Sequence, residues 1–340
     1  MPPPRSPELC ADTIAGVSDP SLPSASPARA HVGLGIAGGL LIGVAADRLL
    51  GDPTHWHPVA GIGRSIAALE ARLYADSRAR GVGLAGVGVG AAWAVGALAA
   101  RQSRVSGTVL VTATATWAVL GGTTLSRVGE SMADALDAGD LEAARRLVPS
   151  LCGRDPYALD EAGMTRAAVE SIAENTSDAA VAPLVWGGLA GIPGLLAYRT
   201  VNTLDAMVGY RNERYGRFGW ASARLDDAAN LLPARLSGVL VVALGGTPLR
   251  TAATWRRDAG RHPSPNAGVV EAAFAGALGV QLGGRTEYPH GVENRPLLGG
   301  GAVPTTADLR AAVRLSRRVQ VGAAVMAAVV AVLINRRSGG

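Results

Sequence analysis

Three acidic residues lie at helical spacing where a polar segment meets an apolar one. Glu170, Glu174 and Asp178 are spaced four apart, so a helix would project all three from one face. Like charges so placed repel each other, and charge is costly beside a membrane. We therefore expect a positive partner: a divalent cation, a metal bound to phosphate, or arginines from elsewhere in the chain.

Further carboxylates and arginines follow the apolar stretch 179–198. Carboxylate oxygens suit Mg²⁺, which one or two carboxylates can hold while substrate phosphates complete its shell. The planar forks of arginine suit phosphate or carboxylate groups. An internal ion-pair network that only stabilises a helical bundle would produce the same pattern. The residues concerned are Arg199, Asn202, Asp205, Arg211, Arg214, Arg217, Arg224, Asp226, Asp227 and Asn230.

Two smaller polar groups lie outside this set. His55 and His57 share a proline-rich loop, where they could bind a metal or a phosphate or could simply cap the loop. Ser264 and Asn266 precede an apolar segment that contains Glu271, and the pattern predicts the start of a helix with one of them as its cap.

The composition favours a membrane protein. Hydrophobic residues make up 48% of the 340 residues and charged residues only 17%, whereas about 25% is usual in soluble domains. Several apolar stretches approach the roughly 17 to 25 residues that a membrane span needs. We expect an all-α, polytopic helical bundle with four to six membrane segments in the cell membrane. The stretches are 33–50, 81–100, 105–122, 179–198, 232–246 and 319–335.

The stretch 179–198 is poor material for a straight span because Pro183, Pro193 and several glycines interrupt it. If the polar groups on either side of it serve one site, they must reach the same side of the membrane. A broken or re-entrant hairpin would allow this. The alternatives are two separate functions or a site near the middle of the membrane.

The remaining organisation is simple. The two stretches 81–100 and 105–122 should form an antiparallel hairpin. We expect residues 1–31, rich in Pro and Ser, to be a disordered N-terminal extension, residues 32–335 to form a single membrane domain, and residues 336–340 to be a short basic tail.

Charge excludes some classes of function. All 32 basic residues are arginine, so a Schiff-base lysine, a pyridoxal-phosphate anchor and the lysine of a Walker phosphate loop are absent. A net charge of +5 is too diffuse to indicate nucleic-acid binding. Two cysteines provide no disulfide framework.

Together these motifs resemble the CobD/CbiB family of cobalamin biosynthesis, the membrane-bound adenosylcobinamide-phosphate synthases. The resemblance spans about residues 32–335 and leaves out the Pro/Ser-rich start of the chain. The motifs that carry it are Gly51-Asp52-Pro53, His57-Pro58-Val59, Glu170-Ser171-Ile172-Ala173-Glu174-Asn175-Thr176-Ser177-Asp178, Tyr198-Arg199, Asn202-Thr203-Leu204-Asp205-Ala206-Met207, Asp226-Asp227 and Ser264-Pro265-Asn266-Ala267-Gly268.

The resemblance implies a carbon–nitrogen ligase. ATP would drive amide formation between the free propionate of adenosylcobyric acid and the amine of aminopropanol or aminopropanol phosphate. Glu174, Asp178 and Asp205 would hold Mg²⁺ on the nucleotide, although the chain contains no recognisable nucleotide-binding motif. Glu170 and Asn175 would belong to the same catalytic motif, and Asp227 or His57 would accept the proton of the amine. Phosphate and substrate binding would fall to Arg199, Asn202, Arg211, Arg214, Arg217, Ser264 and Asn266.

Two other classes remain open. A non-enzymatic membrane sensor or scaffold, like the distantly similar AmpE-type proteins, would use the same charges as ion pairs or ligand sensors. A transporter would be expected to contain internal repeats, and we find none. Besides its substrates, the expected partners are the lipid bilayer and other late-pathway corrinoid enzymes.

Overall fold

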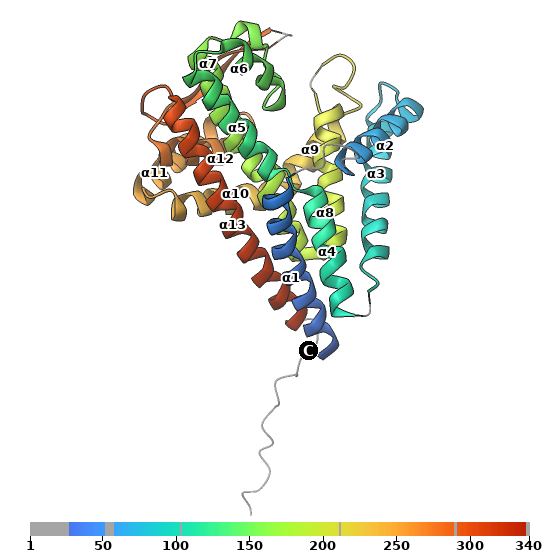
Figure 1. The fold of residues 1–340 in the computed structure, drawn as a ribbon. Helices are drawn as coiled ribbons and strands as arrows, with labels where there is room; N and C mark the ends of the chain where they lie inside the picture. Colours follow the sequence, from blue (N-terminus) through green and yellow to red (C-terminus); the bar gives the residue numbers. More distant parts are fainter. Residues whose placement is uncertain (1–26, 52–57, 103, 211, 289–290, 338–340) are drawn as a thin grey trace, which may run out of the picture.

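The computed structural model describes residues 27–51, 58–102, 104–210, 212–288 and 291–337, which form an elongated bundle of helices (Figure 1). The long helices run side by side toward one end, where α1 begins and α13 ends. The elements are α1 (Pro27–Leu50), α2 (Pro58–Leu73), α3 (Arg78–Ala99), α4 (Val105–Val119), α5 (Gly122–Asp137), α6 (Leu141–Leu147), α7 (Glu161–Thr176), the π-helical turn η3 (Ser177–Val181), α8 (Ala182–Val208), α9 (Trp220–Ala229), α10 (Leu231–Leu244), α11 (Pro248–Asp258), α12 (Ala267–Leu278), β1 (Leu282–Tyr288), β2 (Gly291–Leu298) and α13 (Thr306–Arg337), with short 3₁₀ turns at Val148–Ser150, Pro156–Ala158 and Ala259–Arg261.

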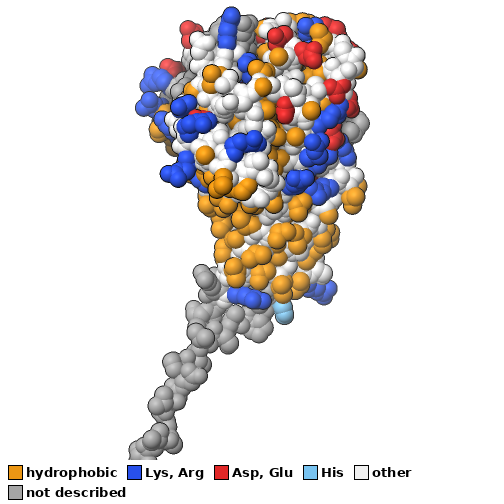
Figure 2. All heavy atoms as spheres, turned by 90° about the vertical axis from the view of Figure 1, so that its left-hand side faces the viewer, with side chains coloured by type: hydrophobic (Ala, Val, Ile, Leu, Met, Phe, Trp, Pro, Cys, Tyr) orange, Lys and Arg blue, Asp and Glu red, His pale blue; other side chains and the backbone are white. Residues whose placement is uncertain are grey.

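The polytopic α-helical architecture predicted from composition is confirmed. In the described residues, five helical segments are long and apolar enough to cross a membrane, or six if the bent pair α9–α10 counts as one span. Figure 2 shows the corresponding belt of hydrophobic side chains, above which lies an end rich in acidic and basic groups. One small element was not expected from the sequence: an antiparallel hairpin formed by β1 and β2.

Helix α8 reverses direction at Gly191. This residue has φ 62° and ψ −147°, a conformation that is essentially reserved for glycine, and Pro193 follows it. A Cβ at Gly194 would collide with the carbonyl oxygen of Trp186, which shows how closely the two arms approach. The hydroxyl of Tyr198 lies 3.1 Å from the carbonyl oxygen of Asp178, although 20 residues separate them. The stretch therefore folds back on itself, as a re-entrant hairpin would.

This hairpin organises its neighbours. Helix α3 packs mainly against α8, and α4 packs mainly against α1 and also against α8. The two stretches 81–100 and 105–122 thus run antiparallel with a short connection, as expected, but they pack against α8 rather than against each other (Figure 1). A Cβ at Gly96 of α3 would come 2.5 Å from Cα of Pro193, so α3 can approach the bend only through glycine. On the opposite side, α1 packs against α4 and α13.

The ends of the bundle differ slightly from the expected boundaries. Helix α1 begins at Pro27, inside the segment 1–31 predicted to be an extension, because proline is well tolerated in the first turn of a helix. Helix α13 continues through Arg337, so it includes the first residues of the predicted basic tail. Residues 1–26 lie outside the described part of the chain.

Candidate functional site

The acidic motif lies where α7 passes into the π-helical turn η3. Helix α7 starts at an Asp160 cap, whose carboxylate accepts a hydrogen bond from the Gly163 N–H at 2.7 Å. Its C-terminal turn continues into η3, which contains Asp178. Glu170 and Glu174 lie in α7, whereas Asp178 lies in this π-helical turn, a type of turn that is frequent at functional sites. The three carboxylates therefore have different surroundings.

Glu170 is held in a buried ion pair. Arg154 donates to its Oε2, and both side chains are only 4% exposed. The N–H of Gly283 donates to Oε1 at 2.6 Å, which ties β1 to α7. The positive partner expected for Glu170 is thus an arginine of the chain itself. Asn175, one turn further on, donates to the Ser171 carbonyl oxygen at 3.0 Å.

Five carboxylates gather beyond Glu170, and we call them the carboxylate cluster. Glu174 lies within electrostatic interaction range of Asp205, and Asp178 within range of both. Asp226 in turn interacts with Asp205 and with the fifth member. The reversal at Gly191 is what returns Asp205, near the end of α8, to the level of η3. The cluster consists of Glu174, Asp178, Asp205, Asp226 and Asp227.

Amide and phenol groups frame this cluster. The Tyr198 hydroxyl lies 2.8 Å from Asn230 Oδ1, and Asn230 Nδ2 donates to Asp226 Oδ2 at 3.0 Å. Asn202 lies beside Asp226, and its Oδ1 accepts a hydrogen bond from Arg199 at 3.4 Å. Asparagine side chains thereby fix one carboxylate oxygen and leave others available.

The donor set of the cluster fits a hard cation such as Mg²⁺. Asp226 Oδ1 is buried and has no hydrogen-bond partner among the described residues, which is costly unless a ligand approaches it. Within the described ranges, however, no group of three or more His, Cys, Asp or Glu side chains converges closely enough to hold a metal ion. Glu174, Asp178 and Asp205 therefore do not form a closed protein cage. A Mg²⁺ ion whose coordination shell is completed by phosphate oxygens does not need a closed protein cage.

A second buried pair adjoins Glu170 and Glu174. His262 Nε2 lies 3.7 Å from Glu271 Oε1, with the side chains 5% and 2% exposed. The Ser264 N–H donates to His262 Nδ1 at 3.0 Å, so a neutral ring carries its proton on Nε2. Burial lowers the pKa of His262 and raises the pKa of Glu271 well above its ordinary value. Burial therefore favours the neutral form of both His262 and Glu271.

The predicted phosphate-binding arginines do not all lie together. Arg214 pairs with Glu70 of α2 at 3.0 Å and stacks on Tyr74, with 4.4 Å between its guanidinium carbon and the ring centre. Arg217 lies 3.4 Å from Asp76, and both are well exposed. These two arginines therefore join α2 and the following loop to the α8–α9 loop. Among the predicted set, Arg199 contacts the frame of the carboxylate cluster directly.

Ser264 and Asn266 form the predicted helix start. The Ser264 hydroxyl accepts from the N–H groups of Asn266 and Ala267, directly before α12. Asn266 also reaches across the molecule, because its Nδ2 donates to the Asp227 carbonyl oxygen at 2.7 Å and its Oδ1 accepts from Arg235 at 2.7 Å. The capping segment thus positions α9 as well as α12.

Two predicted site residues, His57 and Arg211, lie outside the described residues. Conversely, four polar residues near Glu170 and Glu174 were not predicted as site residues. A signal for one of them was present in the sequence, since Glu271 is the single charged residue of the otherwise apolar helix Ala267–Leu278. The arginines gave no such signal, because they are brought to the site from distant loops and strands. The missed residues are Arg154, His262, Glu271 and Arg295.

Fold and site together define a polytopic α-helical membrane protein, with a carboxylate cluster where the two arms of a re-entrant hairpin begin and end. A family model described as CobD/Cbib protein matches residues 40–316, and the chain belongs to this family.

Relatives match over nearly their whole length. "Cobalamin biosynthesis protein CobD" from Mycobacterium tuberculosis is 56% identical over 303 residues, which cover 88% of this chain and 96% of that protein. The proteins of the same name from Geobacter metallireducens and Rhodobacter capsulatus are 44% and 42% identical, covering 87% and 86% of this chain and 97% of each relative. No solved structure matches the chain. The names of these relatives connect the family with cobalamin biosynthesis.

Proposed function

We propose that this protein is a membrane-bound ligase of cobalamin biosynthesis. It would join the free propionate of adenosylcobyric acid to aminopropanol or aminopropanol phosphate in an ATP-dependent reaction, in the cell membrane. The observation that carries the proposal is the reversal of α8 at Gly191, which brings Asp205 into range of Glu174 and Asp178. A structural bundle does not require several carboxylates to gather at that place.

The chemistry explains why such a cluster is useful. A carboxylate is a poor electrophile, so its oxygen first attacks the terminal phosphorus of ATP and ADP leaves. The amine then attacks the carbonyl carbon of the resulting acyl phosphate, and inorganic phosphate leaves as the amide forms. Bound Mg²⁺ would neutralise charge on the phosphates. Glu174, Asp178 and Asp205 would hold that ion, and Arg199 would stabilise negative charge that develops on a transferring oxygen.

The amine must also lose a proton during its attack. Asp227 and His57 remain candidates, and the geometry adds His262. Burial favours the neutral form of His262, whose Nε2 faces Glu271. A neutral imidazole in a dry setting next to a carboxyl group can relay a proton. His262 lies two residues before Ser264 and accepts a hydrogen bond from its N–H, while Asn266 of the same loop donates to the Asp227 carbonyl oxygen, so the two candidates belong to one connected region.

A non-enzymatic sensor is supported by a separate observation. Several arginines are already neutralised, including Arg154 by Glu170 and Arg214 by Glu70, as an ion-pair network would require. This alternative predicts ligand binding without turnover.

Turnover by the purified protein is the direct test. The protein in nanodiscs should convert cobyric acid, aminopropanol phosphate and Mg-ATP to cobinamide phosphate with stoichiometric ADP. Folded protein that binds the corrinoid but forms no amide would exclude the ligase and support the sensor.

Two variants test the proposed Mg²⁺ site independently of the proposed ligase activity. Glu174→Gln and Asp205→Asn should lower kcat by about 100-fold or more, because each removes a charge that acts on the phosphates. Glu142→Gln, an exposed change in α6, is the matched control and should leave kcat unchanged. Wild-type rates in both cluster variants would refute the Mg²⁺ assignment even if the ligase activity is present.

A further inference from the structure

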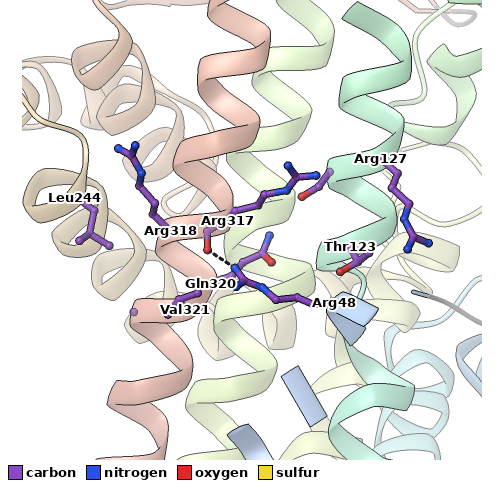
Figure 3. Close-up of a pocket in the computed structure, with 10 residues that line it drawn as sticks. Arg48, Thr123, Arg127, Leu244, Arg317, Arg318, Gln320 and Val321 are labelled. Carbon is purple, nitrogen blue, oxygen red and sulfur yellow. Dashed lines mark hydrogen bonds between the residues drawn. The ribbon is translucent and has the colours of Figure 1, made fainter. Parts of the chain in front are cut away.

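A cavity of about 740 Å³ lies between α1, α5, α10 and α13, away from the carboxylate cluster. Figure 3 shows how its side chains are arranged. Arg127 extends from α5 on one side and Arg318 from α13 on the other, while Arg48 of α1 lies between them. Leu244 and Val321 add apolar walls. None of the residues of the carboxylate cluster lines this space.

The cavity carries a surplus of positive charge. A fourth arginine, Arg317, is neutralised by Glu130, to which it donates twice at 2.7 and 3.0 Å. Arg48 donates to the carbonyl oxygen of Arg317 at 2.9 Å, which fixes its side chain at the cavity wall. In the part of the chain that the structure describes, no carboxylate lies within ion-pair distance of Arg48, Arg127 or Arg318. Arg48 thus lies in the wall of the cavity, and Arg127 and Arg318 stand at its two sides, all three without a carboxylate partner among the described residues (Figure 3).

The position of the cavity relates it to the bilayer. Figure 2 shows arginines gathered along the upper border of the hydrophobic belt. Below the cavity, Val321, Val325 and Val329 follow one another at four-residue spacing on α13, with exposed fractions of 40%, 53% and 52%. A smaller cavity of about 370 Å³, lined by Ala37 and Val329, continues along the α1–α13 face. An apolar path therefore leads from the basic cavity into the belt.

We propose that this cavity binds the headgroup of an anionic phospholipid. The guanidinium fork of Arg48 would contact its phosphate oxygens, and Arg127 and Arg318 would add positive charge on the two sides of the headgroup. One acyl chain would lie along Val321, Val325 and Val329. Basic pockets between membrane helices are suited to such headgroups. The apolar path argues for a lipid rather than a free phosphate, because a free phosphate has no acyl chain that could pack against Val321, Val325 and Val329. The proposal does not depend on the ligase activity.

Lipid binding can be measured on the whole protein in detergent. Native mass spectrometry and thermal shift would compare phosphatidylglycerol, phosphatidylcholine and inorganic phosphate as probes. Phosphatidylglycerol should bind more tightly than phosphatidylcholine and raise the melting temperature. Arg318→Gln and Arg48→Gln should each weaken phosphatidylglycerol binding roughly five-fold, which corresponds to about 1 kcal/mol per arginine.

The control must separate this site from general attraction to a membrane border. Arg80, in the first turn of α3, is exposed at the end of another candidate span and lies outside the cavity, so Arg80→Gln should leave binding unchanged. Equal affinity for the two lipids would overturn the proposal without any variant. An equal loss in Arg80→Gln would reduce it to non-specific attraction. Equal stabilisation by inorganic phosphate, with the same dependence on Arg318, would replace the lipid by a free phosphate.

Discussion

The Arg154–Glu170 pair shows what buried charge does in this molecule. Removing two charges from water is costly, and the pair compensates through close contact and a further N–H donor from Gly283. Glu170 therefore serves to hold the β1–β2 hairpin and the loop at Arg154 against α7. Glu174, one turn away, interacts with the charges of this pair but also with Asp205, so it lies between the ion pair and the carboxylate cluster.

Loss of one partner of this pair should be strongly destabilising. Arg154→Gln leaves Glu170 buried without its counter-charge, and we expect the free energy of unfolding to fall by about 3–5 kcal/mol. Glu142→Gln, which breaks an exposed pair with Arg145, should cost less than about 1 kcal/mol. Unfolding by titration with sodium dodecyl sulfate measures both changes. Similar losses in the two variants would show that burial does not govern the strength of the Arg154–Glu170 pair.

A second residue-scale prediction concerns Asp258 at the end of α11. Hydrogen bonds from Arg257 lower its pKa, and the Gly299 N–H adds a bond at 2.9 Å. Because the folded-state pKa is lowered, this stabilisation is fully present above the unfolded value of about 3.9 and is lost as the pH falls through the folded value.

The melting temperature of Asp258→Asn should therefore lie below that of the wild type at pH 6 and approach it as the pH falls toward about 3. Asp76→Asn, which removes an exposed partner of Arg217, is the comparison and should differ little from the wild type at pH 6. A difference in melting temperature between Asp258→Asn and the wild type that stays constant with pH would contradict the charge-based explanation.

The sequence predicted part of the site for a physical reason. Four-residue spacing places Glu170 and Glu174 on one helix face whatever surrounds them. It could not predict the π-helical turn η3 at Asp178, because such a turn depends on the packing around it. It also could not select Arg154 and Arg295 from 32 arginines, since their approach to Glu174 depends on how distant loops and strands fold.

At the scale of elements, the hairpin in α8 is the feature that assembles the carboxylate cluster. Pro193 and the glycines predicted a break in 179–198, and the reversal follows from local backbone geometry. Its neighbours were not predictable in the same way. Two adjacent apolar stretches normally pack together, but α8 separates α3 from α4 because Gly96 allows it to approach α3 closely.

Substitution at the bend should therefore disturb the site from a distance. Gly191→Ala forces a side chain into a conformation that costs about 1–3 kcal/mol, so the two arms of α8 should separate or shift. We expect a lower melting temperature and at least a ten-fold loss of the proposed ligase activity, because misplacement by about 1 Å can cost 100-fold. Gly90→Ala is the matched control, since its Cβ would meet no atom within 4 Å.

Gly90→Ala should keep both the wild-type melting temperature and the wild-type rate. If Gly191→Ala behaves in the same way, the bend does not determine where Asp205 lies. A variant that melts earlier but keeps its full rate would separate the stability of the bend from the geometry of the carboxylate cluster.

At the scale of the whole molecule, the hairpin decides which loops share a side of the membrane. The helical segment Glu161–Val208 has 48 residues and would be about 72 Å long if straight, more than twice the roughly 30 Å of a bilayer core. Because it folds back, the loops before α7 and after α8 lie at the polar end of the molecule, whereas the α3–α4 connection lies at the other end (Figure 1). The placement of charges on the surface agrees with this division (Figure 2).

This arrangement predicts a labelling pattern in sealed vesicles. Single cysteines at Gly153, Glu213 and Arg101 would be introduced after replacing Cys10 and Cys152 by serine; all three positions are exposed. A membrane-impermeant maleimide should label Gly153→Cys and Glu213→Cys from the same side and Arg101→Cys from the opposite side, while all three react after solubilisation in detergent. A segment that crossed the membrane completely between α7 and α9 would instead place Glu213→Cys with Arg101→Cys. That outcome would separate Asp205 from Glu174 by the thickness of the bilayer, and a single site built from both residues would be impossible.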